Sequence, residues 1–113
     1  MRRGEIYLAS FPFGDAPGMK LRPVLLLTEP IGLAGEVLVA YISSVLPSSL
    51  LASDIVLDPK ASDHQTTNLK TTSVLRLHKL ATIHTTSVRR FLGKLSQATQ
   101  HEVNAKLRAL LSL

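Results

Sequence analysis

A basic side chain stands directly before an apolar run in the segment KLRPVLLLT, residues 20–28. Arg22 separates the glycine- and proline-containing segment FPFGDAPGM from the apolar residues 24–27, so we expect it where a loop meets a buried strand. A guanidinium at such a rim can bind a phosphate through two parallel hydrogen bonds. The alternative is a solvated strand flank that binds no ligand. Lys20 is a second candidate contact for an anion, at the edge of the loop.

The four histidines, His64, His78, His84 and His101, are the other side chains that suggest catalysis or metal binding. They form no HExxH motif, and residues 60–113 contain only two carboxylates, so we expect no zinc or magnesium centre. His78 and His84 flank what we interpret as a short turn between two strands, where they could approach each other. A histidine titrates near neutral pH and could act as a base, but we expect neither to be essential.

Several catalytic motifs are absent from the sequence. It contains no GxSxG, no GxxxxGK[ST] and no GxGxxG, which argues against a serine hydrolase with a nucleophile elbow and against most nucleotide-dependent enzymes. The aromatic content of 4% is too low for an RNA-stacking sheet. Tyr7, Phe11, Phe13 and Tyr41 lie at the ends of early strands, where we favour core packing over base stacking.

Short strands must position these residues. Alternating or continuous apolar segments between polar turns predict strands at residues 4–10, 23–28, 36–43, 53–58, 72–78 and 81–84. Close spacing of short strands favours an antiparallel sheet that closes into a small barrel. The polar stretch SDHQTTNLKTTS is interpreted as a surface loop.

The C-terminal segment has a different pattern. In SQATQHEVNAKLRALLSL, Ser96 is a candidate N-cap, and Val103, Leu107, Leu110 and Leu111 recur at helical spacing. We expect one amphipathic helix with this stripe packed on the barrel. The fold class is therefore mainly β with a C-terminal helix.

Length and composition bound the other expectations. The 113 residues predict a single domain, 1–113, and no apolar stretch approaches the roughly 20 residues that span a bilayer. Glu5 interrupts the N-terminal segment MRRGEIYLAS, so we do not interpret it as a secretion signal and expect a cytoplasmic protein with no membrane partner. The absence of cysteine excludes disulfide bonds.

The charge is distributed unevenly along the chain. Residues 1–59 carry four Lys/Arg and six Asp/Glu, a net charge of −2, whereas residues 60–113 carry nine and two, a net charge of +7. A basic half of this kind suits a polyanionic partner, either a nucleic acid or an acidic protein segment.

The order of these segments resembles the MazF/PemK family of toxins from toxin-antitoxin pairs. The resemblance is carried by RRGEIYLASFPFGDAPGMKLRPVLLLT, by VLVAYISS and by TSVLRLHKLATIHTTSVRRFLGKLS, and it covers nearly the whole chain. It implies a small SH3-like antiparallel β-barrel with a C-terminal helix, which usually forms a homodimer. It also implies a metal-independent endoribonuclease without a cofactor, which a cognate acidic antitoxin inhibits.

The resemblance also implies roles for individual residues. The family's catalytic arginine corresponds to Arg22, and its catalytic Thr/Ser corresponds to Ser43, with Ser44 as the neighbouring alternative. Glu5 stands where the family commonly has Asp, and serine replaces the more frequent threonine. The loop FGDAPGM takes part in RNA recognition in the family and varies among its members, so the cleavage sequence is not predicted.

The chemistry implied is cleavage of single-stranded RNA by attack of its own 2′-hydroxyl, which leaves 2′,3′-cyclic phosphate and 5′-hydroxyl ends. Arg22 would stabilise the developing negative charge, but an arginine stays protonated in water, so the base is unassigned. Candidate RNA contacts are Lys20, Ser44, Arg76 and Lys79. The alternative function is a non-catalytic module of the same fold that binds nucleic acid or protein.

Overall fold

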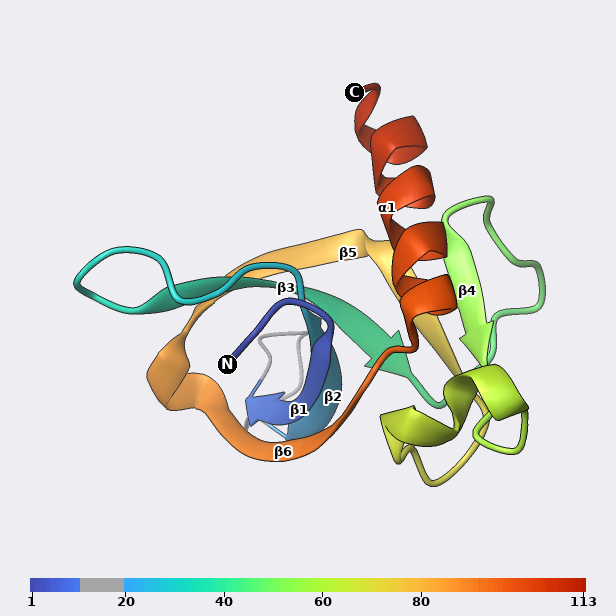
Figure 1. The fold of residues 1–113 in the computed structure, drawn as a ribbon, viewed down its shortest axis with the longest axis horizontal. Helices are drawn as coiled ribbons and strands as arrows, with labels where there is room; N and C mark the ends of the chain where they lie inside the picture. The colour runs from blue at the N-terminus through green and yellow to red at the C-terminus, as the bar shows by residue number, and fades with distance from the viewer. Residues whose placement is uncertain (11–19) are drawn as a thin grey trace.

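The computed structural model describes residues 1–10 and 20–113, which form one six-stranded antiparallel sheet and one C-terminal helix (Figure 1). This confirms the prediction of a mainly β fold with a C-terminal helix. The elements are β1 (Glu5–Ser10), β2 (Leu21–Leu26), β3 (Glu36–Ser43), β4 (Asp54–Leu57), the 3-10 helix η1 (Ser62–Thr67), β5 (Ser73–His84), the 3-10 helix η2 (Thr85–Ser87), β6 (Val88–Lys94) and α1 (Gln97–Leu111). Among the described residues, no helix is long and apolar enough to cross a membrane.

The sheet has two open edges. Its strand order is β4-β5-β3-β2-β1-β6, with no pairing between β4 and β6 among the described residues. η1 and the residue after it contact β6 instead: Thr66 Oγ1 donates to Lys94 O at 2.8 Å, and Asn68 Nδ2 donates to Leu92 O at 2.7 Å. These bonds occupy β6 carbonyls that a closing strand would use. The predicted small SH3-like barrel is therefore not confirmed.

The strand predictions were wrong at the fifth and sixth strands. The segments predicted as two strands at 72–78 and 81–84 form the single 12-residue β5, which bends where its register with β3 shifts (Figure 1). His78 and His84 thus lie on one strand and do not flank a turn between two. β6 was missed because VRRFLGK is largely exposed and has no clear apolar alternation.

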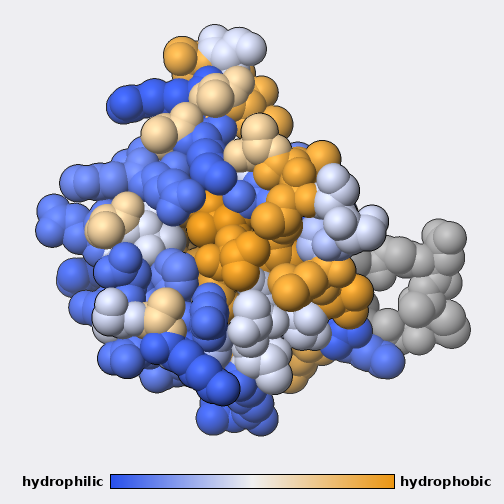
Figure 2. Space-filling view, turned by 90° about the vertical axis from the view of Figure 1, so that its right-hand side faces the viewer, coloured by the Kyte–Doolittle hydropathy of each residue, from blue (hydrophilic) through white to orange (hydrophobic). Residues whose placement is uncertain are grey.

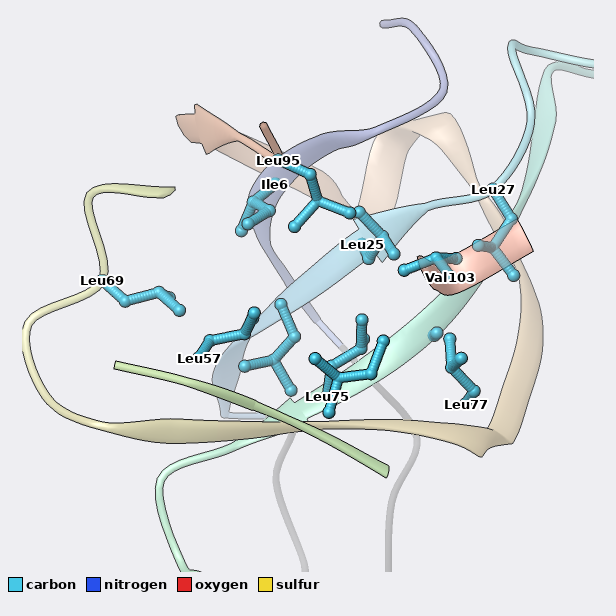
Figure 3. Close-up of a cluster of buried hydrophobic side chains, with 12 residues drawn as sticks. Ile6, Leu25, Leu27, Leu57, Leu69, Leu75, Leu77, Leu95 and Val103 are labelled. Atoms are coloured by element: carbon cyan, nitrogen blue, oxygen red, sulfur yellow. The ribbon is translucent and has the colours of Figure 1, made fainter. Parts of the chain in front are cut away.

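Both faces of the sheet are covered by apolar side chains, which explains the run at residues 24–27. Successive side chains of a strand point to opposite faces. Leu25 and Leu27 join the larger buried cluster, whereas Val24 and Leu26 join a second cluster on the other face. Figure 3 shows the larger cluster, which comprises Ile6, Leu25, Leu27, Ala40, Ile42, Ile55, Leu57, Leu69, Leu75, Leu77, Leu95 and Val103.

α1 begins as predicted and packs on the core through Val103 and Leu107, but its last turn does not. Ser96 is the N-cap, and its side chain accepts a hydrogen bond from Thr99 N at 3.2 Å. Val103 is buried, but Leu110 and Leu111 are 38% and 51% exposed because the helix runs past the edge of the sheet (Figure 1). The predicted apolar stripe therefore has an uncovered second half.

Candidate functional site

β2 and β3 separate at Pro23, and this opening positions Arg22. The two strands pair at Val24↔Tyr41, Leu25↔Ala40 and Leu26↔Val39, and the ladder stops there. Continued by two residues, the same antiparallel register would place Arg22 opposite Ser43. Pro23 has no N–H to extend the ladder. β3 instead continues its pairing with β5, up to Ser43↔Val74.

A pocket of about 580 Å³ opens at this separation. Its lining contains three cationic side chains and no carboxylate among the described residues, so it favours an anionic ligand. Arg22 comes from β2, Arg90 from β6 and Lys70 from the segment after η1. The complete lining is Leu8, Arg22, Pro23, Tyr41, Ile42, Ser43, Ser44, Val45, Asn68, Leu69, Lys70, Thr71, Ser73, Arg90, Phe91 and Leu92.

The three cationic side chains are available to a ligand. Arg22, Lys70 and Arg90 are all exposed. Within residues 1–10 and 20–113, the ion pairs join other residues and include none of these three side chains. Because these cations have no carboxylate partner there, they can bind a phosphate without first breaking an ion pair.

The two serines at the end of β3 differ in their availability. Ser43 is only 9% exposed, and its hydroxyl donates to Val45 O at 3.2 Å and accepts from Val45 N at 3.1 Å. It therefore holds the turn that follows β3. Ser44 is exposed and lines the same pocket. Because a hydroxyl has one proton to donate, Ser43 must release Val45 O before it can donate to a phosphate. The Ser44 hydroxyl forms no hydrogen bond with the residues that the structure describes.

An exposed aromatic ring forms part of the pocket wall. Phe91 is 50% exposed and packs edge-on against Tyr7, with ring centroids 5.4 Å apart. An exposed ring beside cationic groups can stack on a base. The Tyr7 hydroxyl donates to Glu5 at 3.2 Å, and partial burial together with this carboxylate raises the pKa of Tyr7. Tyr7 thus stays protonated at neutral pH and supports Phe91 without acting as a base.

Comparison with known proteins identifies the family. Residues 2–111 match the sequence model of PemK-like, MazF-like toxins of type II toxin-antitoxin systems. The chain belongs to this family. No curated protein sequence matches the chain.

Solved structures of two mycobacterial proteins share the fold of this PemK/MazF-like toxin. An endoribonuclease in complex with its cognate antitoxin, from a mycobacterial species, has a TM-score of 0.74 at 17% identity, covering 100% of this chain and 96% of that chain. The Mycobacterium tuberculosis toxin MazF-mt6 has a TM-score of 0.74 at 23% identity, covering 96% of this chain and 97% of that chain. The fold of the toxin is thus the fold of these two proteins.

The structure brings together only part of the residue set predicted for the toxin. Arg22, Ser43 and Ser44 line one pocket, whereas Lys20, Arg76 and Lys79 lie outside its lining. Lys20 is exposed beside β2, and Lys79 Nζ lies 5.7 Å from the ring centroid of Tyr41, which does line the pocket. The predicted recognition loop FGDAPGM and the preceding Phe11 lie outside the described residues.

Arg76 is part of an ion pair with a buried carboxylate. Its Nε lies 3.1 Å from Asp54 Oδ1 and its Nη2 lies 3.4 Å from Oδ2, with side-chain exposures of 16% and 0%. Asp54 Oδ2 also accepts a hydrogen bond from Leu51 N at 2.8 Å. The ion pair therefore joins β5 to β4, and Asp54 also holds the segment before β4. This gives Arg76 a structural role that its sequence position did not indicate.

Replacing Arg76 with methionine should lower the free energy of unfolding by about 2 kcal/mol, because Asp54 would remain buried without its cationic partner. Urea denaturation followed by circular dichroism measures this change. The matched control is Arg89→Met, at an exposed β6 residue that forms no ion pair within the described ranges, and it should stay within about 0.5 kcal/mol. Equal stability losses in the two variants would contradict a structural role for Arg76.

Three residues of the pocket were missed by the sequence reasoning, namely Lys70, Arg90 and Phe91. The sequence pattern places Lys70 in a surface loop and gives no role to Arg90 and Phe91 in the segment before the helix. The excess of positive charge in residues 60–113 was the available signal. His78 and His84 do not line the pocket, and within the described part of the chain no three His, Asp or Glu side chains gather as metal ligands.

Proposed function

We propose that this toxin is a metal-independent endoribonuclease that cleaves single-stranded RNA. The observation that carries the proposal is the pocket where β2 and β3 separate, which Arg22, Lys70 and Arg90 line together with the serines at the end of β3. Membership of the PemK/MazF-like toxin family supports it. So does the shared fold with a mycobacterial protein described as an endoribonuclease.

The reaction proposed is an internal transfer within the RNA. The 2′-oxygen forms a bond to the adjacent phosphorus, the bond from phosphorus to the 5′-oxygen breaks, and the leaving 5′-oxygen takes up a proton. Arg22 donates hydrogen bonds to the phosphate oxygens and stabilises the charge that grows on them. The described lining contains no histidine or carboxylate to accept the 2′-hydroxyl proton, so we assign no residue to that step.

Lys70, Arg90 and Phe91 would bind the RNA strand around the scissile phosphate. The two cations neutralise flanking phosphates, and the exposed ring of Phe91 stacks on a base. Stacking is tolerant of sequence because every base has an aromatic face, so Phe91 would contribute affinity without selecting a cleavage sequence.

Ser44→Ala should slow cleavage about tenfold at saturating RNA, because the exposed hydroxyl of Ser44 can donate to a phosphate oxygen without breaking another bond. Ser43→Ala removes the hydrogen bonds with Val45 and should instead lower the free energy of unfolding by about 1 kcal/mol. Single-turnover cleavage assays and thermal melts separate the two effects. If Ser43→Ala stopped cleavage in a fully folded protein, Ser43 would be the catalytic hydroxyl and this division of roles would be wrong.

The proposed activity is tested by incubating the purified toxin with long single-stranded RNA in EDTA. We expect fragments that carry 2′,3′-cyclic phosphate and 5′-hydroxyl ends, detected by end-labelling before and after phosphatase treatment. A parallel RNA with 2′-O-methyl groups should remain uncut because its nucleophile is blocked. Intact RNA across varied substrates, with binding retained, would support the non-catalytic binding module instead.

We also propose that a cognate antitoxin inhibits the toxin through an acidic segment that occupies the same pocket as RNA. The cationic lining supports this proposal because an acidic peptide offers the same charge as a phosphate backbone. A mycobacterial endoribonuclease of the same fold has been solved with its cognate antitoxin. The segment and the RNA should therefore compete for binding in a titration.

We propose that the toxin is a homodimer, and an exposed apolar surface supports this. Figure 2 shows apolar residues gathered over the face that carries β4 and α1. Exposed apolar side chains of the elements on this side are Val45, Leu46, Leu50, Leu51, Val56, Leu110 and Leu111. Large apolar patches on soluble proteins usually mark an interface. Sedimentation equilibrium should therefore give twice the chain mass of 12.3 kDa, and a monomer at micromolar concentration would contradict the proposal.

A further inference from the structure

A second basic pocket lies beyond the opposite end of the β6 segment that lines the first. It has a volume of about 610 Å³, and it combines the N-terminal segment, the end of β6 and the first turns of α1. Its lining includes Arg2, Arg3, Glu5, Thr66, Lys94 and Asn104. None of these residues lines the first pocket.

The charge of this second pocket favours an anion. Arg2, Arg3 and Lys94 are exposed, and within the described ranges none of them forms an ion pair. Glu5 is the only carboxylate in the described lining. Its Oε1 accepts hydrogen bonds from Arg2 N at 2.7 Å and from the Tyr7 hydroxyl at 3.2 Å, so this oxygen is already engaged.

The Arg3 side chain is held in place at the pocket wall. Its Nη2 donates to Asn104 Oδ1 at 2.7 Å, and Gln100 Nε2 donates to the same oxygen at 3.0 Å. The pocket thus offers exposed cationic donors, which match the phosphate oxygens of a nucleic-acid backbone.

A narrow ridge separates the two pockets. Asn68 and Leu92 line the first pocket and Thr66 and Lys94 line the second, while the hydrogen bonds between these pairs form the ridge. From Arg90 to Lys94 the strand advances by roughly 13 Å, at about 3.3 Å per residue. A few nucleotides of an extended single strand can cover this distance.

We propose that the second pocket binds the phosphate backbone of the RNA on one side of the cleavage site. The inference rests on the proposed function, because it takes the ligand of the first pocket to be RNA. A strand that leaves the first pocket along β6 crosses the ridge and meets Arg2, Arg3 and Lys94. The site increases affinity for long RNA and takes no part in the chemical step.

The test compares the affinity of short and long RNA in the variant Arg2→Gln/Lys94→Gln. These two side chains form no ion pair within the described residues, so their loss leaves the fold intact. The probes are 2′-O-methyl oligonucleotides of two lengths. One has about 2 nucleotides, too few to occupy the first pocket and also reach Lys94, and the other has about 20, more than the roughly 4–16 nucleotides of usual single-strand sites. Fluorescence anisotropy over a series of salt concentrations measures binding without requiring cleavage.

The expected result is a roughly fivefold to tenfold loss of affinity for the long oligonucleotide and no change for the short one. The slope of log K against log salt should fall in magnitude by about 0.7 for each phosphate that the variant no longer neutralises. The matched control, Lys60→Gln/Arg108→Gln, removes the same charge at residues that line neither pocket, and it should bind both probes like the unmodified toxin.

Three outcomes would overturn the proposal. The first is an equal loss of RNA affinity in the variant and the control, and the second is an equal loss of affinity for the two probes. The third is weaker binding of an antitoxin peptide while RNA affinity is unchanged. Failure of the proposed function looks different. In that case unmodified RNA stays uncut in EDTA, while the variant still loses affinity only for the long probe.

Discussion

Arg22→Ala is expected to reduce the single-turnover rate of RNA cleavage by at least about 100-fold, the usual loss when one fixed donor to a developing charge is removed. The register between β2 and β3, continued by two residues, would place Arg22 opposite Ser43, at the point where the two strands separate. Its side chain is exposed, so its removal leaves no buried group unpaired. The midpoint temperature of thermal unfolding should therefore stay close to that of the unmodified toxin.

Two further variants sharpen this result. Arg22→Lys keeps the charge but loses the planar fork, and it should recover only part of the rate. Arg89→Ala removes an exposed cation next to Arg90 in the sequence but outside the pocket lining, and it should cleave nearly as fast as the unmodified toxin. If Arg22→Ala kept most of its activity, Lys70 or Arg90 would have to carry the stabilisation and the assignment of Arg22 would fail.

Gly93→Ala should lower the free energy of unfolding by about 3 kcal/mol, at the upper end of the usual cost of overpacking. A Cβ at Gly93 would lie 2.2 Å from Thr66 O and 2.6 Å from Thr67 O. Both oxygens belong to the backbone, which cannot rotate away as a flexible side chain would, so η1 must move off β6. Urea denaturation measures the loss.

Gly32→Ala is the matched control for this variant. Gly32 has φ +72, and a methyl group added there would have no atom of the described residues within 4 Å apart from its chain neighbours. Alanine would therefore meet backbone strain alone, worth roughly 1 kcal/mol. A Gly93 variant no less stable than this control would mean that η1 does not pack closely on β6. Because Asn68 and Lys70 follow η1, a displaced η1 should also weaken RNA binding.

Local features of the chain can be predicted from the sequence without the structure. The sequence identifies the start of a strand with a charged residue at its rim, because Arg22, Pro23 and the apolar run that follows lie within a few residues of one another. Ser96 is recognisable as an N-cap for the same reason, because its bond to Thr99 N spans three residues. Leu110 and Leu111 show where this reasoning ends: helical spacing predicts their face but not whether the sheet extends far enough to cover it.

The partners of Arg22 depend on contacts between distant parts of the chain. Lys70, Arg90 and Phe91 reach the pocket because β6 pairs with β1 and η1 packs on Gly93. Arg76 faces Asp54 because of the register between β4 and β5. Apolar periodicity along a sequence determines which face of an element is buried, and it therefore located the core and Arg22 at its rim. Pairing order and register are properties of the folded sheet, and they alone select which cations share a pocket and which are neutralised in ion pairs.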